Sequence, residues 1–297
     1  FIPSVAIGYA LNALIPRPSI GEPSGYTVNT LGSAQPTAVI FGKVRVGGVI
    51  FYQETTNDNK YLHTLIALAG HEIQQIQKVY LNDEELTLDG SGNVTAPTNY
   101  ASKVRIKKHL GADNQAADTD LINESSKWGL NHKASGIAYI YVRFEFDADT
   151  FPNGVPQVTA LVEGKKVVQT GSSVGSYSAN SARCLADYLV FSGIANYNEI
   201  DNSLLTTATS VCDENVTLSG GGTQERYECN GTFTTDIAPK DAVSGMLASM
   251  GGMLWYSQGK WKMKAASFTN PVLNLDENDL RSPLAIQTRN SRRDGFN

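Results

Sequence analysis

The stretch GIAYIYVRFEFDADTF, residues 136–151, carries the clearest strand pattern in the chain. Its residues alternate between two sets. The first set is Ile137, Tyr139, Tyr141, Arg143 and Glu145, and the second is Ala138, Ile140, Val142, Phe144 and Phe146. Because successive side chains of a strand point to opposite faces of its sheet, this alternation predicts a β-strand.

Shorter strands are predicted on both sides of this stretch. Residues 37–55 alternate about a Gly-Gly pair, which predicts two antiparallel strands joined by a tight turn. Residues 60–86 predict strand, loop and strand, because their β-branched residues and an NDEE turn outweigh a partly helical spacing. Residues 155–168 predict two short strands with a turn at Gly164. Together these strands predict one antiparallel barrel or sandwich.

The second half of the chain is predicted to mix helices with strands. Apolar residues recur at spacings of three and four in 181–191, which predicts a helix capped by Ser178 or Asn180. A second helix is predicted over 199–213, with Asp201 as its N-cap.

A third helix is predicted from about Asp236, and MLWYSQGKWKMKAA (253–266) predicts a hairpin. The stretch 87–133 is polar, contains one strand in SKVRIKKHL, and is predicted to be a small insertion. The predicted fold class is therefore mainly β with α+β.

Composition excludes several classes of protein. The 297 residues carry 24 Lys plus Arg against 29 Asp plus Glu, which argues against a basic nucleic-acid-binding surface. No run approaches the roughly 20 apolar residues of a transmembrane helix, so no stable membrane insertion is expected. Three widely spaced cysteines, Cys184, Cys212 and Cys229, do not suit a disulfide framework and are expected to pack as small apolar residues.

The two ends of the sequence lead us to expect a longer polypeptide. The chain begins at Phe1 without an initiator Met and stops directly after an apparent strand. Residues 1–14 predict a short amphipathic helix rather than a signal peptide, because they lack a basic start and a small-residue cleavage site. The Pro-, Gly- and Ser-rich residues 15–36 predict an extended arm that lies on another surface or stays mobile.

No motif in the sequence predicts catalysis or a cofactor. GSSVG at 171–175 matches the nucleophile-elbow pattern, but it falls in a Ser/Gly loop, so a linker is favoured over catalysis by Ser173. DADTF at 147–151 begins like a calcium loop but lacks the later Gly and Glu that such a loop needs. We therefore expect no catalytic residue, no cofactor and no metal site.

Titratable residues also lack a catalytic or metal-binding pattern. The four histidines have no ligand spacing and are predicted to be surface or satisfied core residues; they are His63, His71, His109 and His132. Two acidic groups resemble glycosidase residues only by type and are predicted to be solvated turns; they are Asp83/Glu84/Glu85 and Asp276/Glu277/Asp279.

Six blocks of sequence, in the same order, resemble one known family. They are residues 32–48, 62–86, 136–167, 201–229, 249–263 and 275–297. With these blocks the chain resembles the N-terminal hub region of the bacteriophage tail tip attachment protein J and baseplate hub family, found in lambda-like long-tailed phages and prophages. The resemblance covers nearly the whole chain, and the stretch 87–133 is its least diagnostic part.

The resemblance implies a structural hub of a phage tail tip in the virion, with no enzyme activity. In such hubs a homotrimer closes the distal end of the tail tube, and two β-barrel domains per subunit give a pseudo-sixfold ring. The implied partners are the distal tail protein, other tail tip proteins and the tape-measure protein. A host receptor would be bound through parts outside this chain, and DNA would cross the lumen only transiently, which the weak negative charge suits.

The resemblance and the strand pattern together predict five domains or segments. They are an N-terminal helix and extended arm (1–36), a first hub β-barrel (37–86 and 134–170), an inserted small domain (87–133), an α+β hub domain (171–270) and the start of a second hub barrel (271–297).

Two kinds of interface are expected. One is the apolar N-terminal segment around Val5, Tyr9 and Leu14, and the other is the hairpin with Trp255 and Trp261, which alternatively fill the core of the α+β domain. The alternative function is a tail-associated glycan- or peptidoglycan-degrading enzyme. Such an enzyme should place two carboxylates about 5–10 Å apart in a deep pocket.

Overall fold

The computed structural model describes residues 29–32, 35–168, 175–268, 270 and 279. The chain divides into two compact units, residues 1–266 and 267–297, and the first holds the secondary structure described below. The predicted helix over 1–14 lies outside the described residues, as does the start of a second barrel over 271–297 apart from Asp279. The proposed domain boundaries stay predictions.

The first sheet has five strands, and the stretch quoted at the outset forms one of its inner strands. In spatial order the strands are β1 (Thr30–Leu31), β4 (Val49–Thr56), β5 (Tyr61–Ala69), β11 (Ala138–Glu145) and β10 (Val104–Leu110). β1 runs parallel to β4, and the other pairs are antiparallel. Strand β10 lies within 87–133, so this predicted insertion shares a sheet with the strands on either side of it.

The second sheet is built around one long strand. Its members are β13 (Gly175–Tyr177), β12 (Val158–Val168), β6 (Ile73–Leu81) and β7 (Glu84–Glu85), with β3 (Lys43–Val46) also paired to β12. β12 is unbroken, so the predicted turn at Gly164 is wrong. The Gly164 N–H donates to the carbonyl oxygen of Gly42 at 2.8 Å, and a Cβ at Gly164 would overlap the carbonyl oxygen of Ile40. The glycine is needed for a close backbone crossing rather than for a turn.

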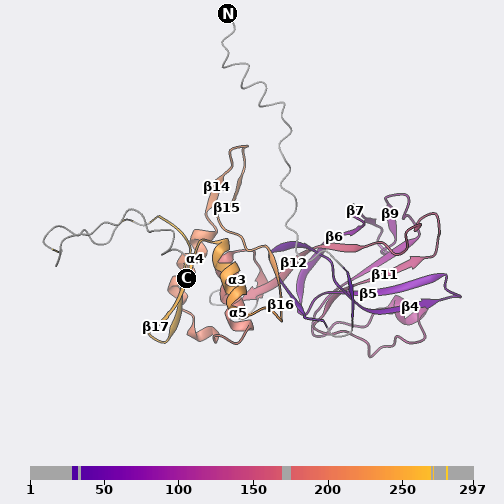
Figure 1. The fold of residues 1–297 in the computed structure, drawn as a ribbon, viewed down its shortest axis with the longest axis horizontal. Coiled ribbons are helices and arrows are strands. Elements are labelled where there is room, and N and C mark those ends of the chain that lie inside the picture. The colour runs from indigo at the N-terminus through magenta and orange to yellow at the C-terminus, as the bar shows by residue number, and fades with distance from the viewer. Residues whose placement is uncertain (1–28, 33–34, 169–174, 269, 271–278, 280–297) are drawn as a thin grey trace, which may run out of the picture. The chain divides into compact units, whose positions relative to one another are not determined.

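The two sheets enclose the larger hydrophobic core. From β11 the core takes Ala138, Ile140, Val142 and Phe144, which are four of the five residues of one alternating set in the sequence. The fifth, Phe146, lies beyond the end of β11 and is exposed. Along one seam the ammonium group of Lys108 on β10 donates to the carbonyl oxygen of Ile76 on β6 at 2.8 Å. The sheets in Figure 1 therefore form a half-closed barrel around this core.

The second half of the first unit adds helices and short hairpins. The helices are α3 (Ser181–Phe191), η1 (Tyr197–Glu199), α4 (Asn202–Cys212) and α5 (Pro239–Ser249). The paired strands are β14 (Asn215–Thr217) with β15 (Thr223–Glu225), β16 (Gly231–Thr234) with β2 (Ala38–Phe41), and β17 (Met253–Ser257) with β18 (Lys260–Lys264). The smaller elements β8 (Thr87–Leu88), β9 (Val94–Ala96) and α2 (Thr119–Glu124) belong to the stretch 87–133.

The predicted helices in this half are present. Asn180 caps α3 by accepting from the N–H groups of the first turn, and Asp201 caps α4 in the same way. The third helix begins at Pro239 rather than at Asp236, and its N-cap is Ala238. The fold is thus mostly β with several helices, as the sequence predicted.

The helical half and the barrel half are joined by strands and by an ion pair. Strand β2, next to the barrel, pairs along its length with β16. Lys165 on β12 lies 2.8 Å from the carboxylate of Asp187 on α3, and both side chains are largely buried. A second hydrophobic core lies among α3, α4, α5 and the strands β2, β12 and β18. It includes all three cysteines, none of which forms a disulfide. The cysteines pack as the small apolar residues expected from the sequence.

No helix in the described part of the chain has the length and apolarity needed to cross a membrane.

Replacing Gly164 by Ala should destabilise the first unit. The new Cβ would meet the Ile40 carbonyl oxygen, so the backbone crossing must widen, and overpacking of this kind costs about 1–3 kcal/mol. Gly90→Ala is the matched control, because nothing lies within 4 Å of a Cβ at Gly90. Urea unfolding should show a lower midpoint for Gly164→Ala than for Gly90→Ala. Equal midpoints would contradict the close crossing.

Candidate functional site

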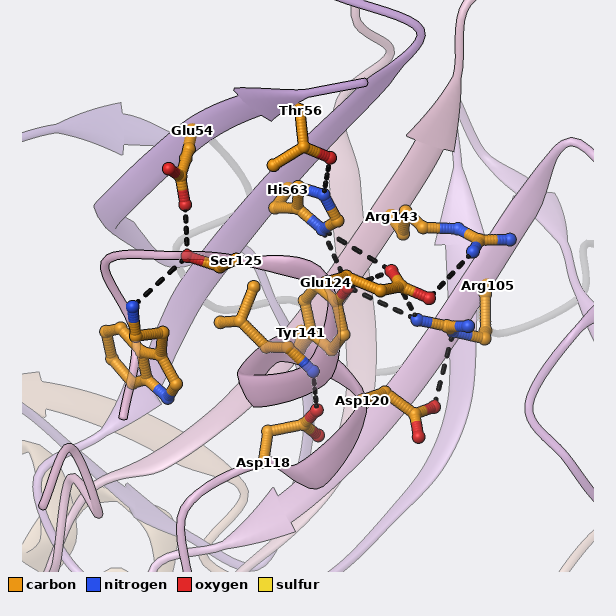
Figure 2. Close-up of polar contacts among 12 residues, drawn as sticks. Glu54, Thr56, His63, Arg105, Asp118, Asp120, Glu124, Ser125, Tyr141 and Arg143 are labelled. Carbon is orange, nitrogen blue, oxygen red and sulfur yellow. Dashed lines mark hydrogen bonds and ion pairs between the residues drawn. The ribbon is translucent and has the colours of Figure 1, made fainter. Parts of the chain in front are cut away.

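A short helix and the loop after it cover the outer face of the first sheet. Helix α2 presents Leu121, and the following loop presents Trp128, to Leu65, Tyr139 and Tyr141 of the sheet. Tyr139 and Tyr141 belong to the first alternating set of β11, and the second set enters the main core, so this strand is buried on both faces. A polar network lies along the same contact (Figure 2).

Glu124, the last residue of α2, holds two arginines of the sheet. Its carboxylate accepts from Arg105 of β10 at 2.9 Å and from Arg143 of β11 at 3.0 Å. Arg105 also lies 3.4 Å from Asp120, one turn earlier in the helix. Because the arginine side chains are 12% and 18% exposed, these ion pairs are partly shielded from water. Glu124 therefore ties helix α2 to two neighbouring strands.

His63 lies at the centre of the network and is fully buried. Its ring nitrogens lie 2.7 Å from the hydroxyl of Thr56 and 2.8 Å from the hydroxyl of Tyr141. Burial lowers the pKa of His63, and Arg143 lowers it further, although the nearby Glu124 acts in the opposite direction. The imidazole is therefore neutral, and it serves as a satisfied core residue.

The two ends of α2 are also fixed by side chains. At the start, Asp118 accepts from the Leu121 N–H at 2.8 Å and lies 2.8 Å from His109. Burial acts to raise the pKa of Asp118, but the hydrogen bonds from His109 and Leu121 outweigh it and lower the pKa. At the end, the Ser125 hydroxyl donates to the buried carboxylate of Glu54.

The arrangement suits a structural clamp rather than general acid catalysis. A catalytic acid needs a raised pKa, so that it carries a proton at neutral pH. Burial acts to raise the pKa of Glu54, but the hydrogen bonds from Ser125 and Tyr52 outweigh it and lower the pKa. Glu124 is held by two arginines. Glu54 is thus not prepared to donate a proton at neutral pH.

The other candidate residues from the sequence have structural partners. Asp83 pairs with Arg45 at 2.5 Å, and Glu85 pairs with Lys78 at 2.9 Å. Asp147 accepts from the Asp149 N–H at 3.1 Å, which makes an acidic turn. Ser173, Asp276 and Glu277 lie outside the described residues.

The remaining histidines also contact protein groups. His71 accepts from the Ile40 N–H at 3.0 Å, and burial lowers its pKa. His109 stacks on Tyr139 with ring centroids 4.2 Å apart, and His132 accepts from the Gly129 N–H at 2.8 Å. Among the described residues, no three His, Cys, Asp or Glu side chains gather as ligands for a metal.

The predicted interface residues are only partly within the described chain. Val5, Tyr9 and Leu14 lie outside it. Trp255 is 37% exposed on β17, whereas Trp261 on β18 is half-buried against the second core. Trp255 is opposite Lys262, and Tyr256 is opposite Trp261, so the two tryptophans project from opposite faces of the hairpin.

The clamp around Glu124 was not found from the sequence. Helix α2 has six residues, too few to show a helical period. The available signals were the Asp118 cap before it and the position of Arg143 among the tyrosines of one face of β11. Neither signal identifies the partner of Arg143, because Glu124 reaches it only through the tertiary fold.

Comparison with known proteins gives a similarity of fold to a solved structure. No protein-family model and no curated protein matches the chain. Among solved structures, the chain is similar to a chain in the virion of a native gene transfer agent particle, with a TM-score of 0.53 and 16% sequence identity. The match covers 93% of this chain and 67% of the other. At this identity the similarity shows a shared fold.

Replacing Glu124 by Gln should destabilise the packing of α2 on the sheet. The change leaves Arg105 and Arg143 without their carboxylate, and hydrogen bonds to charged groups contribute roughly 1.5–3 kcal/mol. Glu85→Gln is the matched control, since its ion pair with Lys78 is exposed and such pairs contribute about 0–1 kcal/mol. Amide hydrogen exchange should rise in residues 119–128 of Glu124→Gln alone. Unchanged exchange there would contradict the clamp.

Stability should fall as the pH is lowered from 7.5 to 5.5. His63 is neutral when folded because its pKa is lowered, whereas the unfolded chain binds a proton near pH 6.5. Its contribution is therefore present above pH 6.5 and is lost below it, by at most about 1.4 kcal/mol per pH unit. His71 adds a contribution of the same sign.

Urea unfolding at several pH values measures this loss. His63→Gln should reduce the pH dependence, whereas replacement of the exposed His132 by Gln should leave it as in the unmodified chain. The charged groups facing His63 are Glu54, Glu124, Arg105 and Arg143. The pKa of Glu54 is lowered, so the stability that depends on its ionised form is lost at a lower pH than the contribution of His63. If the stability of His63→Gln kept the full pH dependence of the unmodified chain, the assignment of His63 as a neutral buried imidazole would be wrong.

Proposed function

We propose that this chain is a structural component of a phage-like virion. The observation that carries the proposal is the similarity in fold, over 93% of the chain, to a chain of a gene transfer agent virion. The ordered sequence blocks that resemble phage tail tip proteins point in the same direction. These two comparisons are independent in kind, because one uses the backbone and the other the residues.

More specifically, the chain acts as the hub at the distal end of a tail tube. In this role it forms a homotrimeric ring, contacts the distal tail protein and the tape-measure protein, and carries fibre or receptor-binding parts. Through those parts it contributes to host attachment, and its lumen passes DNA. The predicted barrel boundaries and the second barrel beyond residue 271 belong to this proposal.

The polar chemistry of the described residues supports a structural role. The Glu124 clamp, the neutral His63 and the Lys165–Asp187 pair each hold neighbouring elements together. Buried pairs of this kind contribute to one fixed arrangement of elements. A ring component must keep such an arrangement while neighbouring proteins bind to it.

The purified full chain should have the mass of a trimer. Analytical ultracentrifugation measures the mass, and negative-stain images should show rings, because cyclic symmetry closes a heterologous interface. Incubation with peptidoglycan and with bacterial polysaccharide should release no reducing sugar. A monomer that cleaves either polymer would contradict the hub proposal and support the alternative of a glycan- or peptidoglycan-degrading enzyme.

Removing residues 1–28 should leave the first unit folded but prevent its incorporation into particles. The deletion keeps Asn29, which accepts from the Val158 N–H at 2.7 Å and donates to the Val158 carbonyl at 2.9 Å. Circular dichroism and the unfolding midpoint test the fold, and immunoblotting of purified particles tests incorporation. Normal incorporation would show that the N-terminal segment is not an interface.

A further inference from the structure

An apolar groove lies where the ends of β4 and β5 meet the β2–β16 pair. Its volume is about 640 Å³, within the range of natural ligand sites. Small and apolar side chains form most of the lining; among them are Val46, Val49, Phe51, Ala67, Leu68 and Ile137. Among the described residues that line the groove, Asp236 is the only charged one. The groove therefore suits an apolar occupant that carries a single positive charge.

The chain enters the first unit beside this groove. Thr30 is part of the lining, and its N–H donates to the carbonyl oxygen of Gly48 at 3.1 Å. The preceding residue, Asn29, is held by two hydrogen bonds to Val158 at the start of β12. Residues 1–28 therefore begin from a fixed point on the barrel, next to Thr30 at the edge of the groove.

The sequence of this segment matches the chemistry of the groove. Residues 1–14 contain no charged side chain and are mainly apolar. Within residues 1–42, Arg17 is the only basic residue and Glu22 the only acidic one. Arg17 lies three residues after the apolar stretch, so the segment carries one positive charge beside its apolar part. The apolar groove carries one negative charge, that of Asp236. Charge and apolarity are thus complementary between segment and groove.

Residues 15–28 link the apolar segment 1–14 to the barrel, and the length of this linker favours binding of the segment to a neighbouring copy. Residues 15–28 can span about 45 Å when extended, at roughly 3.3 Å per residue. A compact unit of about 240 residues has a radius of gyration near 18 Å, which corresponds to a diameter of about 45 Å. The linker therefore reaches a neighbouring copy, whereas occupation of its own groove would require the linker to fold back on itself. Its Pro-rich sequence opposes such compaction.

We propose that residues 1–14 of one copy occupy the groove of the next copy, with Arg17 beside Asp236. Each subunit then gives one segment and receives one, which is a heterologous contact that closes in a ring. The proposal rests on the trimer proposed above and names the contact that holds it. It also assigns a role to Val5, Tyr9 and Leu14, whose side chains fill the groove.

Disulfide cross-linking in the full chain tests the contact. Leu11→Cys is combined with Thr232→Cys, because Thr232 lines the groove and Cys is close to Thr in size. Mild oxidation should give covalent dimers and trimers on a non-reducing gel. The control combines Leu11→Cys with Ile194→Cys, at an exposed position outside the groove lining, and should stay monomeric. The native cysteines are buried and should not react.

Other outcomes overturn the proposal. A cross-link within one chain would place the segment in its own groove, and the absence of any cross-link would place it elsewhere. The mass of the unoxidised protein separates this failure from a failure of the hub. A trimer without cross-links would overturn only the segment exchange, whereas a monomer would overturn both.

A charge reversal tests the assigned ion pair separately. Asp236→Lys should lower the cross-linking yield about two- to fivefold, in line with the modest strength of exposed pairs. Combining it with Arg17→Asp should restore the yield, because the pair is re-formed with opposite signs. Asp241→Lys, on α5 outside the groove lining, is the control and should leave the yield unchanged. If Asp236→Lys lowered the cross-linking yield and the added Arg17→Asp did not restore it, the pairing of Arg17 with Asp236 would be wrong.

Discussion

The burial of β11 on both faces is the constraint on which much of the barrel half depends. One face enters the main core with Ile140 and Val142, so it can be wholly apolar. The other face carries Tyr139, Tyr141 and Arg143, and the polar groups of Tyr141 and Arg143 need partners once water is excluded. Helix α2 supplies the main partner through Glu124 and also covers the aromatic rings. The stretch 87–133 is therefore a component of the packing of the first sheet.

The sequence predicts a feature well when the residues that determine it are close together along the chain. The strand at β11 and the cap at Asp201 depend on neighbours within a few residues, and the sequence predicts both. For α3 the sequence offers Ser178 or Asn180 as the cap, and the structure has Asn180. Gly164 was misread because a glycine in a strand serves either a turn or a close crossing, and only the position of Ile40 decides between them. Long-range partners leave no local pattern in one sequence, and the Glu124 clamp is such a case.

The same limit applies to the candidate sites. Each histidine and each acidic turn had both a chemical and a structural interpretation in the sequence, and the difference lies in what the side chain meets. His63 meets Tyr141 and Thr56, which complete its hydrogen bonds, and Asp83 meets Arg45. Trp255 and Trp261 had two interpretations as well, and the register of one hairpin separates them: one is exposed and the other packs on a core.

The connection between the two halves of the first unit bears on the kind of function this fold serves. Enzymes with a cleft between domains commonly move about a hinge. Here β2 pairs with β16, and Lys165 pairs with the buried Asp187, so any hinge at this boundary would have to break backbone hydrogen bonds and expose a buried charge. The two halves therefore act as one body. A connection of this kind fits the structural role proposed above better than a cleft that opens and closes about a hinge.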